Sequence, residues 1–98
     1  MVELELLPEA LADSQQAYEW YEGRRDGLGE EFLQCLDECL LAVRRMPLGF
    51  PAVHRRYRRA LVRRFPYAVI FKPTRKRIYV YSVFHCSQNP EKWRKRLD

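Results

Sequence analysis

Residues 57–71, YRRALVRRFPYAVIF, contain two strand signals that meet at a proline. The run YAVIF, residues 67–71, is continuously apolar and rich in β-branched and aromatic residues, which is typical of a buried strand. The segment before it is predicted to be another strand, from about residue 55 to residue 63, and Pro66 is predicted to form a tight corner between the two. Six arginines precede that corner: Arg55, Arg56, Arg58, Arg59, Arg63 and Arg64. The stretch therefore predicts a sheet with unusually high positive charge at its edge.

Further strands are indicated on both sides of this stretch. VELELL, residues 2–7, alternates apolar and acidic residues, so it predicts a strand with one buried face. IYVYSVF, residues 78–84, predicts the last strand of a meander, with KPTRK as the preceding turn. The tail from Pro90 predicts a short C-terminal helix.

Two helices are predicted between the first strand and the meander. The first covers residues 9 to about 24, and the second begins at residue 28 or 29 and ends before Pro47. The apolar stripe of the first is expected to be Leu11, Ser14, Ala17, Tyr18 and Tyr21. That of the second is expected to be Leu28, Phe32, Cys35, Leu36, Cys39, Leu40 and Val43. Because only about four residues join the helices, we expect an antiparallel hairpin.

This order of elements predicts one α+β domain over residues 1–98, with the helical hairpin on one face of the sheet and the other face at least partly open. Side chains alternate between the two faces of a strand. Tyr57, Arg59, Leu61, Arg63 and Phe65 should share one face, and Arg58, Ala60, Val62 and Arg64 the other. Arginine is therefore expected on the open face, whichever of the two sets of side chains lies there.

Charge is divided sharply along the chain. Residues 1–43 contain eleven acidic and two basic residues, whereas residues 44–98 contain sixteen basic and two acidic ones, within a formal net charge of +5. This asymmetry indicates that the C-terminal half meets an anionic partner. A basic module that simply binds nucleic acid remains an alternative, although acidic helices would repel a phosphate backbone.

The expected location of the protein and the expected absence of a cofactor rest on features that the sequence does not contain. No segment approaches the length of a membrane span, and the acidic N-terminus does not resemble a signal peptide, so a cytoplasmic protein with reduced thiols is expected. Cys35 and Cys39 are one helical turn apart, but Cys86, His54 and His85 do not complete a ligand spacing. We therefore expect no metal site and no small-molecule cofactor, with zinc at the paired thiols a minor alternative.

Three segments together resemble the ParE/RelE superfamily of bacterial toxins from type II toxin–antitoxin modules. They are WYEGRRDGLGEEF (residues 20–32), YRRALVRRFPYAVIF (residues 57–71) and YVYSVFHCSQNPEKW (residues 79–93). The resemblance extends from about Val2 to Trp93 and is closer to the ParE, or plasmid stabilisation, branch. It implies a RelE/ParE-like fold and a bacterial toxin that a cognate antitoxin neutralises by wrapping it with a C-terminal segment.

The two branches imply different targets. ParE-like members are similar to inhibitors of DNA gyrase, and RelE-like members are ribosome-dependent endoribonucleases that cut mRNA. RelE-like sequences carry an arginine after the tyrosine that opens the third strand, where this chain has Ala68 after Tyr67. They carry another arginine after the last strand, and many ParE-like sequences have one at the position occupied here by Gln88. The resemblance therefore favours a gyrase inhibitor over a nuclease, and leaves open a degenerate, non-toxic member.

Site residues are expected on the arginine-bearing strand and near the chain's end. The partner-binding candidates are Tyr57, Arg59, Arg63, Arg64, His85 and Trp93. Arginines that alternate with aromatic side chains suit carboxylates, phosphates or an acidic peptide. Arg59, Arg63 and His85 are also the catalytic candidates for a divergent nuclease. A structural role is favoured for His85 at a strand end and for Trp93 as the residue that packs the last helix on the sheet.

The remaining charge runs are expected to be solvated faces without function. They include Arg24, Arg25, Arg75 and Arg77.

Overall fold

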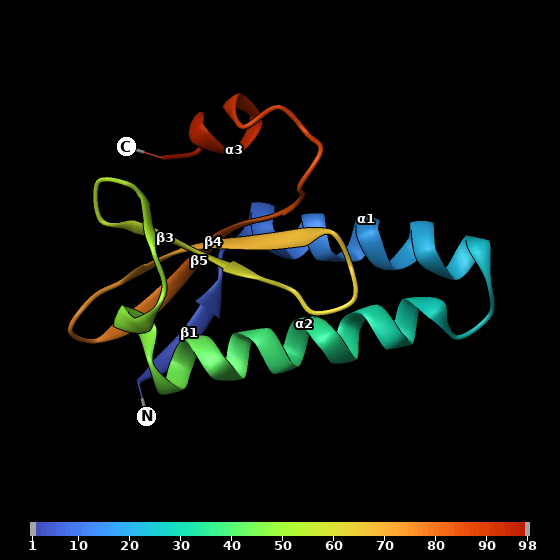
Figure 1. The fold of residues 1–98 in the computed structure, drawn as a ribbon, viewed down its shortest axis with the longest axis horizontal. Helices are drawn as coiled ribbons and strands as arrows, with labels where there is room; N and C mark the ends of the chain where they lie inside the picture. The colour runs from blue at the N-terminus through green and yellow to red at the C-terminus, as the bar shows by residue number, and fades with distance from the viewer. Residues whose placement is uncertain (1, 98) are drawn as a thin grey trace.

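The structure is a computed structural model that describes residues 2–97. Its elements are β1 (Glu3–Leu6), α1 (Pro8–Arg24), α2 (Leu28–Arg45), the 3₁₀ turn η1 (Pro47–Gly49), β2 (Ala52–His54), β3 (Tyr57–Leu61), β4 (Tyr67–Pro73), β5 (Arg77–His85) and α3 (Glu91–Arg94). The α1–α2 hairpin packs on one face of the sheet and α3 on the other (Figure 1). This arrangement confirms the α+β class. None of the helices in residues 2–97 has the length and apolar character that a bilayer crossing requires.

The sheet has the strand order β1-β5-β4-β3-β2. β1 joins β5 in parallel after the helical hairpin has crossed one face, and β3, β4 and β5 form the antiparallel meander that the sequence predicts. The short edge strand β2, antiparallel to β3, was not predicted. It has only three residues, too few to show an alternating pattern.

The predicted strand over residues 55–63 was too long at both ends. Arg55 has a φ of 51° and Arg64 a φ of 73°, both in the left-handed region that a β-strand cannot contain. Arg55 therefore lies in the turn between β2 and β3, and the chain leaves the sheet after Leu61. Consequently Arg63 and Arg64 are not strand residues, and Arg63 does not share a strand face with Arg59.

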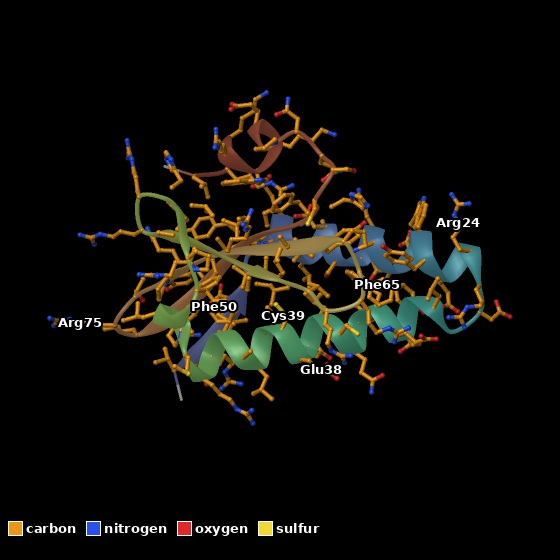
Figure 2. The ribbon with its side chains drawn as sticks, viewed as in Figure 1. Arg24, Glu38, Cys39, Phe50, Phe65 and Arg75 are labelled. Atoms are coloured by element: carbon orange, nitrogen blue, oxygen red, sulfur yellow. The ribbon has the colours of Figure 1, made fainter. Side chains whose placement is uncertain are left out.

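The main core lies between the helical hairpin and the sheet. Phe32 of α2 is 0% exposed and stacks on Tyr21 of α1 at a ring distance of 5.4 Å. Phe65 meets the rings of both residues edge-on, and Figure 2 shows its side chain between α2 and the sheet. The α2 stripe follows the prediction. The α1 stripe does not include Leu11, which is 59% exposed.

Small side chains on α1 explain that difference. The buried residues of α1 are Ala10, Ser14, Ala17 and Tyr21, at helical steps of four, three and four. Alanine and serine allow the helix backbone to approach the sheet closely, so the buried stripe begins one residue earlier than the larger Leu11 suggested.

The connection between the helices depends on two glycines. Gly27, the N-cap of α2, has a φ of 88°, a conformation that glycine adopts without a Cβ penalty. Both oxygens of the Glu22 carboxylate accept backbone N–H bonds, one from Gly27 and one from Gly29, each at 2.9 Å. A Cβ on Gly29 would lie 2.7 Å from the carbonyl oxygen of Tyr18, so glycine there allows the two helices to touch.

A second, smaller core lies on the opposite face of the sheet. It contains Tyr57, Ala68, Ile70, Phe84 and Trp93. Trp93 is 5% exposed, and its ring lies 5.6 Å from that of Phe84. The face expected to be open is thus partly covered by α3, and Trp93 packs that helix on the sheet.

Candidate functional site

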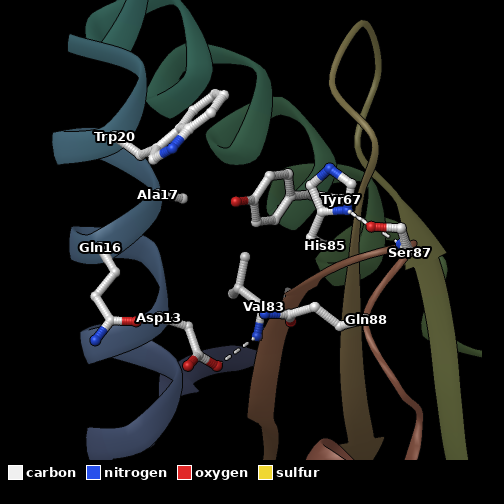
Figure 3. Close-up of a pocket in the computed structure, with 9 residues that line it drawn as sticks. All are labelled: Asp13, Gln16, Ala17, Trp20, Tyr67, Val83, His85, Ser87 and Gln88. Atoms are coloured by element: carbon white, nitrogen blue, oxygen red, sulfur yellow. Dashed lines mark hydrogen bonds between the residues drawn. The ribbon is translucent and has the colours of Figure 1, made fainter. Parts of the chain in front are cut away.

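A cavity of about 350 Å³ opens between α1 and the ends of β4 and β5 (Figure 3). Its lining residues are Asp13, Gln16, Ala17, Trp20, Tyr67, Val83, His85, Ser87 and Gln88. The cavity exists because β1 pairs with β5 only as far as Val80. From Ser82 to His85, the outer edge of β5 has no partner strand among the described residues.

Asp13 occupies the base of the cavity and satisfies part of this free edge. Its Oδ2 accepts a hydrogen bond from the backbone N–H of Val83 at 3.0 Å and another from the Ser82 hydroxyl at 3.4 Å. The Arg96 guanidinium donates to both carboxylate oxygens, at 2.5 and 3.0 Å, and to the carbonyl oxygen of Tyr81 at 3.2 Å. The Asp13 carboxylate therefore ties α1 to β5 and, through Arg96, to the chain that follows α3.

This ion pair is mostly removed from water. The side chains of Asp13 and Arg96 are only 16% and 22% exposed. The hydrogen bond to Asp13 is the main reason that the pKa of Arg96 is raised above its ordinary value. Neither residue was predicted from the sequence to be part of a site, although Asp13 follows Ala10 by three positions and precedes Ala17 by four. An acid on a buried helical stripe was the available signal.

His85 and Tyr67 form the wall of the cavity that faces α1. Their rings meet edge-on with centroids 5.2 Å apart. The backbone N–H of Ser87 donates to Nδ1 of His85 at 3.0 Å, and the Ser87 hydroxyl lies 2.7 Å from the same atom. Because a backbone N–H can only donate, Nδ1 is the acceptor and the ring proton of neutral His85 is on Nε2. His85 thus stabilises the chain as it leaves β5, the structural role that the sequence favoured.

Two aromatic side chains line opposite parts of the cavity. The Tyr67 hydroxyl points towards α1 (Figure 3), and burial is the main reason that the pKa of Tyr67 is raised, so it stays protonated at neutral pH. Trp20 is 54% exposed, with the Arg24 guanidinium 4.3 Å from its ring centroid. Trp20 therefore lies at the exposed rim of the cavity.

The predicted arginine surface is divided between two parts of the molecule. Arg63 pairs with Glu38 at 2.8 Å, and Arg64 pairs with Glu31 at 2.9 Å, so both guanidinium groups lie against α2. Arg25 binds the other oxygen of Glu31 at 3.0 Å. Arg59 is exposed on the face away from the α1–α2 hairpin and forms no ion pair with any residue from 2 to 97.

Tyr57 and Trp93, also predicted to bind a partner, are buried in the small core beneath α3. The indole Nε1 of Trp93 has no hydrogen-bond partner among the described residues. Because both rings are almost fully buried, neither is open to a partner in this structure. Of the six partner-binding candidates, only His85 therefore lines the cavity.

The thiols and histidines do not gather into a metal site. Among residues 2–97, no group of three or more His, Cys, Asp or Glu side chains is placed to hold a metal ion. Burial raises the pKa of the Cys39 thiol to about 11, so this cysteine behaves as a small core residue.

Comparison with known proteins gives a family match over most of the chain. Residues 4–90 match the family model described as the ParE toxin of the type II toxin–antitoxin system, parDE. No curated protein matches the chain. One similar solved structure is described as the chromosomal ParDE TA system from P. aeruginosa, with a TM-score of 0.74 and 19% identity over 87% of this chain and 96% of that chain. At this identity, the structural match supports the fold alone.

Proposed function

The chain belongs to the ParE toxin family of type II toxin–antitoxin systems, and we propose that a cognate antitoxin neutralises it by docking along the cavity between α1 and β5. The observation that carries this proposal is the stretch of the β5 edge beyond β1, which has no partner strand among the described residues and whose main chain Asp13 binds only at the Val83 N–H. An extended peptide can add to an exposed sheet edge through main-chain hydrogen bonds, while its side chains enter neighbouring pockets. Here the edge borders a cavity walled by Tyr67 and Trp20, which suits an apolar or aromatic anchor.

The exposed arginines are proposed to receive the acidic part of the same antitoxin. Arg59 is available without breaking an ion pair to any described residue. Arg63 and Arg64 can exchange Glu38 and Glu31 for antitoxin carboxylates at little cost, because exposed ion pairs contribute little to stability. A disordered antitoxin segment with alternating apolar and acidic residues fits both requirements.

Inhibition of DNA gyrase in the bacterial cytoplasm is the proposed toxic action. This part rests on the ParE resemblance and on the chemistry that the cavity lacks. RNA cleavage needs cations to stabilise the charge that develops on phosphorus. No arginine or lysine is among the residues that line the cavity, and Arg59 and Arg63 lie elsewhere. His85, the candidate base, already accepts at Nδ1 from Ser87.

Inducible expression in bacteria separates the possible targets. Gyrase inhibition should produce filamentation, a DNA-damage response and, with purified proteins, loss of supercoiling activity. Rapid translation arrest with cleaved mRNA would instead support the RelE-type alternative. Normal growth, with gyrase unaffected by purified protein, would indicate a degenerate member and contradict the proposed toxicity.

Docking in the cavity can be tested with the protein's own fluorescence. Trp20 is half exposed at the rim, whereas Trp93 is buried below α3. We expect the cognate antitoxin to shift the emission of wild type and of Trp93→Phe, but not that of Trp20→Phe. A shift of equal size in Trp20→Phe would show that the antitoxin docks elsewhere.

A further inference from the structure

The end of the sheet opposite the cavity gathers positive charge from two turns. Tyr67 pairs with His85 at the cavity end of the β4–β5 hairpin, and Pro73 pairs with Ile78 at the other end. Arg75 and Lys76 occupy the turn at that other end. Arg56 lies in the β2–β3 turn, which is at the same end because Arg58 of β3 pairs with Phe71 of β4. Figure 1 shows both turns at the left of the molecule, one above the other, and Figure 2 shows Arg75 extending away from the body of the molecule.

A shallow cavity of about 340 Å³ lies beside the β2–β3 turn. Its lining residues are Arg55, Arg56, Tyr57 and Lys72. The Lys72 ammonium lies 5.2 Å from the centroid of the Tyr57 ring, a distance at which the ring attracts the cation. This contact holds Lys72 in the cavity beside the turn that contains Arg56.

The positive charge of these turns is weakly compensated by the chain itself. Residues 39–90 contain no aspartate or glutamate. Within residues 2–97, Arg56, Arg75 and Lys76 form no ion pair, whereas the neighbouring Arg77 pairs with Glu3 and Glu5 of β1. In contrast to Arg63 and Arg64, which pair with acids of α2, these cations remain available to a ligand.

We propose that this cationic end, defined by Arg56, Lys72, Arg75 and Lys76, binds the phosphate backbone of a nucleic acid without reading its sequence. A protein partner would need an apolar or aromatic anchor at the centre of the contact. The one aromatic ring lining the cavity, that of Tyr57, is already buried. Exposed guanidinium and ammonium groups on turns instead match a row of phosphates, which they contact irrespective of base.

Binding of this kind has a measurable salt dependence. For about four phosphate contacts to duplex DNA, affinity should fall about 100-fold between 50 and 200 mM salt. We would measure it by fluorescence anisotropy of the purified full chain with a short labelled DNA duplex and with a single-stranded RNA. Tighter binding of the duplex would identify DNA as the source of the phosphates, and tighter binding of the single strand would identify RNA.

A matched pair of variants separates a defined site from net charge. Arg56→Gln/Arg75→Gln removes two cations of the proposed site, and Lys92→Gln/Lys95→Gln removes two exposed cations of the α3 segment. The first variant should weaken binding and reduce the slope of log affinity against log salt by about 2, while the second leaves the slope nearly unchanged. All four positions are exposed, so unchanged thermal midpoints should confirm that both variants fold.

Two results would overturn the proposal. One is an equal loss in both variants, which would mean that net charge alone attracts the nucleic acid. The other is no binding of either probe at 50 mM salt. Neither result depends on gyrase inhibition or on antitoxin docking, so this inference can fail while the proposed function stands.

Discussion

The two faces of the sheet are stabilised in different ways. The face under the α1–α2 hairpin has a continuous core in which Phe32, Val43, Val69 and Phe71 are fully buried. The opposite face is partly covered by the four residues of α3, which are held by the Trp93 ring and, beyond the helix, by Leu97 and the Arg96–Asp13 ion pair. One face is thus secured by many apolar contacts, and the cover of the other by a few apolar side chains and one pair of charges. We infer that the first face sets global stability, whereas the second can open locally.

The strongest test of this difference is to truncate one large side chain on each face. Phe32→Ala removes a fully buried ring that packs on Tyr21, Phe65 and Tyr67, and it should lower the free energy of unfolding by about 3–5 kcal/mol. Trp93→Ala should cost only about 1–3 kcal/mol, because α3 can detach while the main core stays intact. Urea denaturation gives both values. Equal losses would mean that the two faces unfold as one unit.

The α1–α2 hairpin, which covers the first face, should also be intolerant of added atoms between its two helices. Gly29→Ala places a Cβ 2.7 Å from the Tyr18 carbonyl oxygen, so the helices must separate, at a cost of about 1–3 kcal/mol. Gly23→Ala is the matched control on α1, since a Cβ there meets nothing within 4 Å. It should leave stability unchanged or raise it by about 0.5–1 kcal/mol. A neutral Gly29→Ala, measured by thermal unfolding, would show that the hairpin is loosely packed.

The sequence predicted the elements of the face under the α1–α2 hairpin better than those of the opposite face, and the reason is physical. Apolar residues at helical and alternating spacing recur over many positions, so the hairpin, the meander and the inward residues of α2 could be read directly. The boundaries of β3 could not be predicted from the sequence, because they depend on the left-handed backbone conformation of Arg55 and Arg64. The pairing of Arg63 and Arg64 with α2 follows from those same turns, which no local pattern shows.

The candidate site was harder to predict because long-range contacts build it. Asp13 and Arg96 are 83 positions apart, and nothing near either residue indicates the other. Tyr67 was read only as the first residue of a strand, and its hydroxyl faces a cavity that exists because β1 ends early. Trp93 was predicted to pack the last helix on the sheet, since a lone tryptophan in a short terminal helix has few other ways to be buried.

Breaking the ion pair should loosen α3 without unfolding the main core. Asp13→Asn keeps the shape of the side chain but removes the charge that Arg96 binds, and it should cost about 1–2 kcal/mol. Hydrogen exchange should accelerate in residues 91–97, and Trp93 emission should move to longer wavelength. Glu9→Gln is the control, because Glu9 is exposed and lies 3.4 Å from Arg96. Unchanged exchange in Asp13→Asn would mean that Trp93 alone holds the segment.

The smallest effect on stability is expected from the exposed ion pairs of Glu31 on α2, and it should depend on pH. Hydrogen bonds from Arg64 and then Arg25 lower the pKa of Glu31 below its ordinary value of 4.5. A lowered carboxyl pKa stabilises the fold above the unfolded-state pKa, and the contribution is lost as pH falls through the folded-state value. Arg64→Gln should therefore melt slightly below wild type at pH 7, and the gap should close below about pH 4. Arg56→Gln is the control, because it breaks no ion pair, and the difference between its melting temperature and that of wild type should not change with pH. If the difference for Arg64→Gln is also independent of pH, the ion pair of Arg64 with Glu31 adds nothing to stability.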